Sequence, residues 1–175
     1  MVEEWLEITG IVSSFVGIGL SFFLAFYIRY LDKKQRERDE SFYKSMTLKN
    51  VNQLNEQLIE IQEMSESEND IPELDEQIEI VHRLNVYSSR NKRLLESLIS
   101  DTRFFMSKWL SLPKTEKENI DYLINTTNWV LDEYLPKSNE SENTQKRKLI
   151  ASLSEFINRK NNASNKINKI IEKYS

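Results

Sequence analysis

The sequence predicts an all-α protein: a single N-terminal transmembrane helix followed by a cytoplasmic antiparallel helical bundle. Two observations lead to this expectation. Residues 8–28 form a run of 21 residues without a charge, proline, asparagine or glutamine. All three glycines of the 175-residue chain lie inside that run, and in the remainder apolar residues recur at helical spacing between abundant Glu, Lys and Asn.

The apolar run has the length of a membrane span. At a rise of about 1.5 Å per residue it reaches roughly 31 Å, close to the hydrocarbon thickness of a bilayer. A cleavable signal peptide is the competing interpretation, but it needs a basic start, a shorter apolar core and small residues at the cleavage site. The chain starts with the acidic Glu3 and Glu4. It places the bulky Phe26, Tyr27 and Ile28 where the cut would fall.

The charges beside the run predict its orientation in the cell (inner) membrane. Lys and Arg near a span stay on the cytoplasmic side, whereas acidic residues have little influence. Residues 1–7 contain no Lys or Arg, so we expect them outside the cell. Residues 29–40 are then expected to form a charged cytoplasmic neck. Trp5 at one end and Tyr27 and Tyr30 at the other are expected to anchor in the two headgroup regions. The residues that determine this topology are Arg29, Lys33, Lys34, Arg36 and Arg38.

Small residues recur inside the run at intervals of four. Such a stripe lets two helix backbones approach closely in lipid, where packing and hydroxyl hydrogen bonds hold helices together. The simpler interpretation is that Gly and Ser are common in membrane spans. The stripe predicts a homo-oligomer formed through the span, with the packing residues Gly10, Ser13, Ser14, Gly17, Ser21 and Ala25.

Residues 41–175 predict the bundle. We expect a first helix to about residue 64, a loop before Pro72, a long helix over 73–111, a third helix ending before Pro136, and a last helix to the chain end. Apolar residues spaced by three and four are typical of coiled-coil seams, and short connections favour antiparallel neighbours. The seams contain Val51, Leu54, Leu58 and Ile61; Leu74, Ile78, Val81, Leu84, Leu95, Leu98, Thr102, Phe105 and Trp109; Ile120, Ile124, Thr127, Leu131 and Tyr134; and Leu149, Leu153, Phe156, Lys160, Ala163, Ile167, Ile170 and Tyr174.

Two local features of these helices lead to further expectations. Residues 88–93 of the long helix are entirely polar, which predicts a kink or an excursion out of the core. Thr115 and Glu118 have the spacing of a capping box, in which each side chain bonds to the backbone of the other. The third helix is therefore expected to begin at this pair.

Charge is segregated along a chain whose net charge is only −4. Residues 50–80 contain ten acids and no Lys or Arg, whereas residues 144–175 contain eight bases and two acids. We expect the acidic helical hairpin to face the basic terminal helix. Alternatively, the basic helix lies on anionic lipid, joined by Arg90, Lys92 and Arg93. Nucleic acid is not favoured as a partner, because the basic residues are not interleaved with exposed aromatic ones.

Catalytic and metal chemistry have little support in the sequence. His82 is the single histidine. With Glu79 it has the Glu-x-x-His spacing of di-iron bundle proteins, but such a site needs a second motif and two more carboxylates. We therefore expect a surface or boundary histidine, no metal, no cofactor and no enzymatic activity. The absence of cysteine agrees with a reducing compartment.

Two functions follow as hypotheses. The first is a membrane-tethered, non-enzymatic helical interaction or scaffold protein whose bundle binds a cytosolic protein or a second copy. The alternative is an oligomerising membrane-active effector of the toxin or defence type that permeabilises the lipid bilayer. Recognition of an external ligand by its own ectodomain is excluded for both, because residues 1–7 are too few to fold around one.

Overall fold

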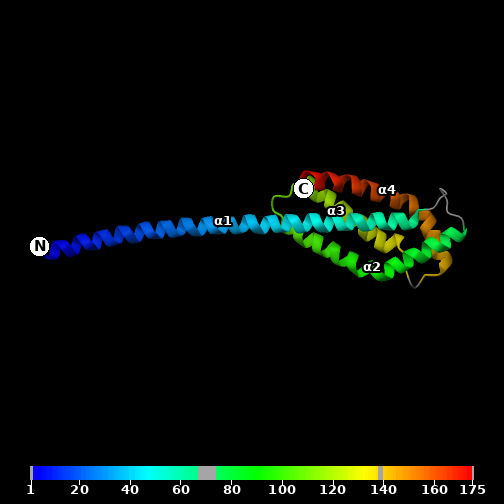
Figure 1. Cartoon of the computed structure of the whole chain (residues 1–175), viewed down its shortest axis with the longest axis horizontal. Coiled ribbons are helices and arrows are strands. Elements are labelled where there is room, and N and C mark those ends of the chain that lie inside the picture. Colours follow the sequence, from blue (N-terminus) through cyan, green and yellow to red (C-terminus); the bar gives the residue numbers. More distant parts are fainter. Residues whose placement is uncertain (1, 67–73, 138–139, 175) are drawn as a thin grey trace. The chain divides into compact units, whose positions relative to one another are not determined.

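The computed structural model describes the backbone of residues 2–66, 74–137 and 140–174, and the side chains of residues 20–66, 75–137 and 140–174. The described residues form four α-helices and no strand: α1 (Val2–Ser65), α2 (Leu74–Lys108), α3 (Lys114–Trp129) and α4 (Glu142–Tyr174) (Figure 1). A π-helical segment, η1 (Val130–Tyr134), continues α3. The predicted all-α class is confirmed.

The chain divides into two compact units, Met1–Phe42 and Tyr43–Ser175. Within the described part, no helix has a stretch long and apolar enough to cross a membrane. Of the predicted span, residues 8–19 lie outside the residues whose side chains are described.

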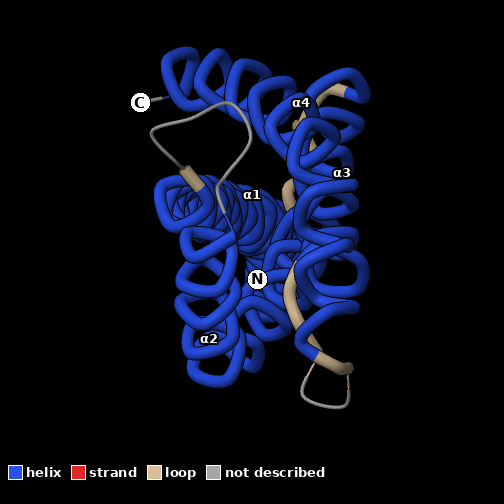
Figure 2. The backbone as a smooth tube through the Cα atoms, turned by 90° about the vertical axis from the view of Figure 1, so that its right-hand side faces the viewer, coloured by secondary structure: helices blue, strands red, loops and turns tan. Residues whose placement is uncertain are grey.

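The second unit is an antiparallel bundle, as the short connections predict. The portion of α1 that belongs to this unit, from Tyr43 onward, lies between α2 and α4 (Figures 1 and 2). Successive helices run in opposite directions (Figures 1 and 2). Polar contacts between helices accompany this arrangement. The Tyr87 hydroxyl on α2 donates to Gln57 Oε1 on α1 at 2.7 Å. The Ser164 hydroxyl on α4 donates to Asn55 Oδ1 on α1 at the same distance.

The predicted seams account for most of the core. All four seam residues of α1, from Val51 to Ile61, are completely buried. The prediction for Ile78 is wrong, since this side chain is 41% exposed whereas that of Ile80 is 1% exposed. Residues two apart on a helix differ in direction by about 200°, so a seam that runs through Ile80 and Leu84 turns Ile78 outward. Leu74 falls outside the described side chains.

The polar seam residues Thr102 and Thr127 are fully buried, as predicted. Each satisfies its hydroxyl within its own helix. Thr102 donates to the Leu98 carbonyl at 2.6 Å, and Thr127 donates to the Leu123 carbonyl at 3.0 Å. This bond to the residue four positions earlier lets a threonine occupy a core position without leaving a buried hydroxyl unpaired.

Residues 88–93 do not leave the helix. The α2 helix continues through them without a break, although it curves along its length (Figure 1). The Ser89 hydroxyl donates to the Val86 carbonyl at 2.8 Å, a local bond of the kind that bends helices. None of the six residues is buried, so the polar run marks a stretch of continuous helix that lies out of the core.

The predicted capping box at the start of α3 is wrong. The helix begins at Lys114 after Pro113, and no side chain caps its first turn. The Pro113 carbonyl accepts the backbone N–H groups of Glu116 and Lys117 at 3.1 and 3.0 Å. Proline suits this position because its fixed φ leads into a helix and its missing N–H group is not needed there.

The spacing of apolar residues in the sequence does not predict the π-helical segment η1. Its last turn closes with the Leu135 N–H group bonded to the Val130 carbonyl at 2.8 Å. The Tyr134 ring stacks on Phe156 with centroids 4.4 Å apart. Burial raises the pKa of Tyr134 to about 12, an effect that the nearby Ser65 partly offsets. The Ser65 hydroxyl donates to the Ile61 carbonyl at 2.7 Å, and the buried Tyr134 hydroxyl has no hydrogen-bond partner among the described residues.

A fragment that starts at Ser41 is expected to fold alone, because the core of the second unit lies within Tyr43–Ser175. Circular dichroism should show high helicity and a single cooperative thermal transition. Leu58→Ala, in the centre of the core, should lower the free energy of unfolding by about 2–5 kcal/mol. Leu110→Ala, at a side chain that is 85% exposed, is the control and should change it by less than about 0.5 kcal/mol. Helicity without a cooperative transition would contradict the folded bundle.

Candidate functional site

Residues 20–28, the part of the predicted span whose side chains the structure describes, expose large apolar side chains on every side of α1. Phe22 is 67% exposed and Phe26 is 72% exposed. Because successive residues turn by about 100° around a helix, the stretch has no covered face. The Phe23 and Tyr27 rings stack one turn apart with centroids 6.3 Å apart. The exposed large apolar residues of this stretch are Leu20, Phe22, Phe23, Leu24, Phe26, Tyr27 and Ile28, and the exposed Tyr30 and Leu31 follow in the neck.

The structure describes part of the predicted packing stripe. Ser21 and Ala25 are both exposed and lie one turn apart on α1. The predicted anchors Tyr27 and Tyr30 are exposed as well. The remaining predicted residues of the stripe and the first anchor lie outside the described side chains: Gly10, Ser13, Ser14 and Gly17, and Trp5.

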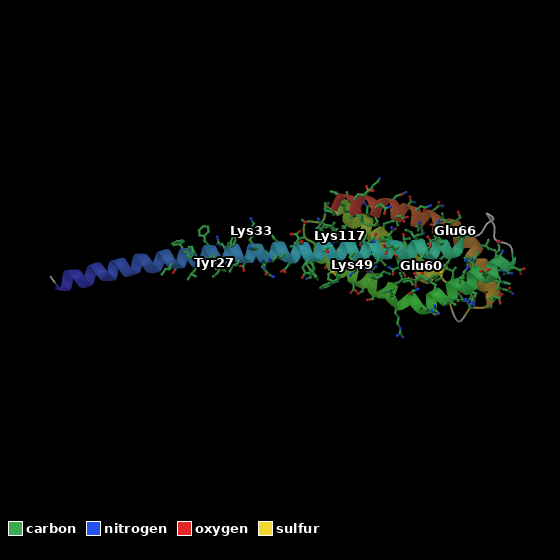
Figure 3. The ribbon with its side chains drawn as sticks, viewed as in Figure 1. Tyr27, Lys33, Lys49, Glu60, Glu66 and Lys117 are labelled. Carbon is green, nitrogen blue, oxygen red and sulfur yellow. The ribbon has the colours of Figure 1, made fainter. Side chains whose placement is uncertain are left out.

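The predicted topology residues form an exposed basic neck on α1. Arg29, Lys33, Lys34, Arg36 and Arg38 are all exposed. In Figure 3 the side chains of Tyr27 and Lys33 project outward from α1. Lys34 Nζ lies 6.0 Å from the centre of the Tyr30 ring, and Lys33 pairs loosely with Glu37 at 3.9 Å. Pairs this exposed contribute little to stability.

Cations of the basic terminal helix lie against α3. Arg159 lies over the Trp129 ring at 4.8 Å from its centre, and Lys166, seven residues later, lies over the Tyr122 ring at 4.2 Å. Such cation–π contacts are worth about 0.5–1 kcal/mol when exposed. The predicted attraction between this helix and the acidic residues 50–80 stays a prediction.

A second step of seven residues along α4, from Lys166 to Lys173, leads to an ion pair. Lys173 Nζ donates to the buried carboxylate of Glu116 at 2.5 Å, and the Tyr174 hydroxyl donates to the other oxygen. Trp109 meets the Tyr174 ring edge-on at 5.0 Å, and Lys44 from α1 lies over that ring at 4.8 Å. Burial by itself raises the pKa of Glu116, but the hydrogen bonds from Lys173 and Tyr174 outweigh it and hold the pKa below its usual value.

His82 is exposed, as predicted for a surface histidine. Its predicted companion Glu79 pairs with Arg83 at 4.0 Å. Among the described residues no three His, Cys, Asp or Glu side chains gather into a possible metal site. His82 borders a cavity of about 320 Å³ between α1 and α2, together with Tyr87 and Arg90.

A second cavity uses residues that the sequence marked only as a polar run. It has a volume of about 420 Å³ and lies between α2 and the chain that leaves η1. Its lining combines hydroxyl, amide and cationic groups with two apolar side chains. We call this cavity the basic pocket; its residues are Asn85, Ser88, Ser89, Lys92, Arg93, Leu131, Pro136 and Lys137.

Comparison with known proteins assigns no family to this arrangement. No protein-family model, no curated protein and no solved structure matches the chain. What the chain does is therefore inferred from its own residues.

The Glu116 cluster is expected to make the stability of the bundle depend on pH. A carboxyl group whose pKa is lower in the folded than in the unfolded chain stabilises the fold above its unfolded pKa of about 4.5 and loses that effect as the pH falls through the folded value. Glu116→Gln should therefore lower the thermal midpoint at pH 7 and flatten its decline below pH 4.5. The control is Glu118→Gln, on the exposed side of the same helix. Identical pH profiles for the two variants would contradict the assignment.

Proposed function

We propose that the chain is a membrane-tethered, non-enzymatic helical interaction protein. Residues 8–28 cross the membrane once, residues 29–40 form the cytoplasmic neck, and the bundle is held on the cytoplasmic side for a protein partner or a second copy. One observation carries this proposal: from Leu20 to Ile28 α1 exposes apolar side chains around its whole circumference, and five exposed cations follow directly.

The energetics of water exposure support a lipid environment for this stretch. Burying one large apolar side chain is worth about 1.5–3 kcal/mol, so Phe22, Phe23 and Phe26 together favour transfer out of water strongly. A helix also suits lipid, because its backbone N–H and C=O groups are bonded within the segment. The basic neck supports the orientation, since cations beside a span are retained in the cytoplasm.

The chemistry of the bundle supports interaction rather than catalysis. The buried carboxylate of Glu116 is used to hold Lys173 and Tyr174, and so ties α3 to the end of α4. The exposed His82 has neither a carboxylate nor a hydroxyl group bonded to it among the described residues. In triad-type sites a further side chain orients the general base, and His82 has no such partner among the described residues.

Cysteine labelling tests the orientation, because the chain contains no cysteine. Lys117→Cys, at an exposed position on α3 (Figure 3), should resist an impermeant thiol reagent in intact cells and react after lysis. Glu3→Cys is the matched control and should react in intact cells. Neutral residues in place of the five neck cations, with a Lys added near Val2, should weaken or invert this pattern. Labelling of Lys117→Cys in intact cells would reject the orientation.

The second candidate is an oligomerising membrane-active effector. It is favoured by the exposed small residues Ser21 and Ala25, which continue the four-residue spacing of Ser13 and Gly17. Gly17→Ile should weaken self-association of the span by on the order of 1–2 kcal/mol in a membrane reporter assay, because a branched side chain keeps the backbones apart. Leu20→Ile, outside this stripe, is the control.

Cell growth separates the two functions. For an effector, expression of the wild type should collapse the membrane potential and arrest growth, and Gly17→Ile should abolish both effects while the protein still inserts. For a tether, both proteins should be tolerated. Equal self-association of wild type and Gly17→Ile would show that the small-residue spacing has no packing role.

A further inference from the structure

We propose that the basic pocket binds a phosphate ester. This inference goes beyond the proposed tether and does not depend on the membrane orientation. The pocket brings together the polar run of α2 and the segment that follows η1, which are more than forty residues apart in the sequence.

The charge of the pocket suits an anion. Lys92 and Arg93 come from α2 and Lys137 comes from the segment after η1, and among the described residues no acidic side chain lines the cavity. Lys92 is paired only loosely, with Glu96 at 4.0 Å across an exposed surface. Arg93 has no ion-pair partner among the described residues. A guanidinium group matches a phosphate because two of its N–H groups can bond two phosphate oxygens at once.

The polar lining is held in place from outside the pocket. Gln145 on α4 accepts a hydrogen bond from the Asn85 amide at 3.0 Å. Its own amide group donates to the carbonyls of Lys137 and Glu140 at 2.9 and 3.2 Å. These carbonyl oxygens are therefore engaged, which reduces their repulsion of an anion. The hydroxyl of Ser88 adds a short group that can donate to a phosphate oxygen.

The size and the apolar wall point to an ester rather than to a bare ion. A volume of about 420 Å³ lies within the range of roughly 300–1,000 Å³ typical of small-molecule sites. Leu131 and Pro136, both buried, supply an apolar surface next to the cations. A phosphate held by the cations with a short carbon moiety against this wall uses both parts of the lining.

The π-helical segment explains how this wall is made. Its wider turn ends at Leu135 and keeps Tyr134 in the core against Phe156. Leu131, from the same segment, borders the pocket instead. Single π-turns within α-helices are frequent at functional sites, where they change the direction of side chains.

Binding of glycerol 3-phosphate, a soluble phosphate monoester, to the full-length protein, purified in a non-ionic detergent, tests the proposal by titration calorimetry. Sodium chloride at matched ionic strength controls for screening. The double substitution Lys92→Ala with Arg93→Ala should weaken binding by about tenfold or more, because charge-assisted bonds are lost. Lys114→Ala with Lys117→Ala removes the same charge from the exposed start of α3 and should leave binding unchanged. Circular dichroism should show equal helicity for all three proteins.

Binding of two short-chain phospholipids in the same detergent distinguishes a lipid headgroup from a soluble phosphate ester as the ligand. Short-chain phosphatidic acid carries a phosphate monoester, whereas short-chain phosphatidylglycerol carries only a diester. Tight pocket-dependent binding of glycerol 3-phosphate alone supports a soluble ester. Stronger binding of phosphatidic acid than of phosphatidylglycerol, lost on substitution of Lys92 and Arg93, supports a lipid headgroup. Absence of binding by every probe, or equal binding by the pocket variant and the wild type, would overturn the proposal.

Discussion

The antiparallel register of α3 on α4 is the constraint on which much of the bundle depends. Arg159, Lys166 and Lys173 follow one another at intervals of seven on α4 and meet Trp129, Tyr122 and Glu116 in reverse order along α3. A seven-residue repeat keeps one face of a helix toward its partner over its whole length. A slip of one residue would turn these cations by about 100° away from their rings. The register therefore positions both ends of the helix pair.

At one end of the pair, the register assembles a cluster around a buried carboxylate. Glu116 is taken out of water at the first turn of α3, which is costly for a charge without partners. Lys173 and Tyr174 compensate this cost from the last turn of α4. Removing one partner would leave a buried charge, which destabilises a protein more than the intact pair stabilises it. The end of α4 is thus held by an interaction that tolerates little change.

At the other end of the helix pair, α3 continues into the π-helical segment η1. Tyr134 packs against Phe156 and so remains in the core. One additional residue within the turn is accommodated by the bond from Leu135 to Val130. The chain then leaves toward Pro136 and Lys137, beside the polar face of α2. A cavity arises where a bend in one element meets a polar run in another, and neither feature alone predicts it.

The sequence by itself determined what depends on local periodicity and on one-dimensional composition. The seam from Val51 to Ile61, the buried Thr102 and Thr127, and the antiparallel helical class could all be predicted, because a 3.6-residue period and short connections are local properties. The apolar run and the basic neck after it were readable for the same reason. Tertiary structure decided the rest. Whether Ile78 or Ile80 is buried depends on how α2 is rotated against its neighbours, and the basic pocket depends on contacts between distant segments, which no local pattern records.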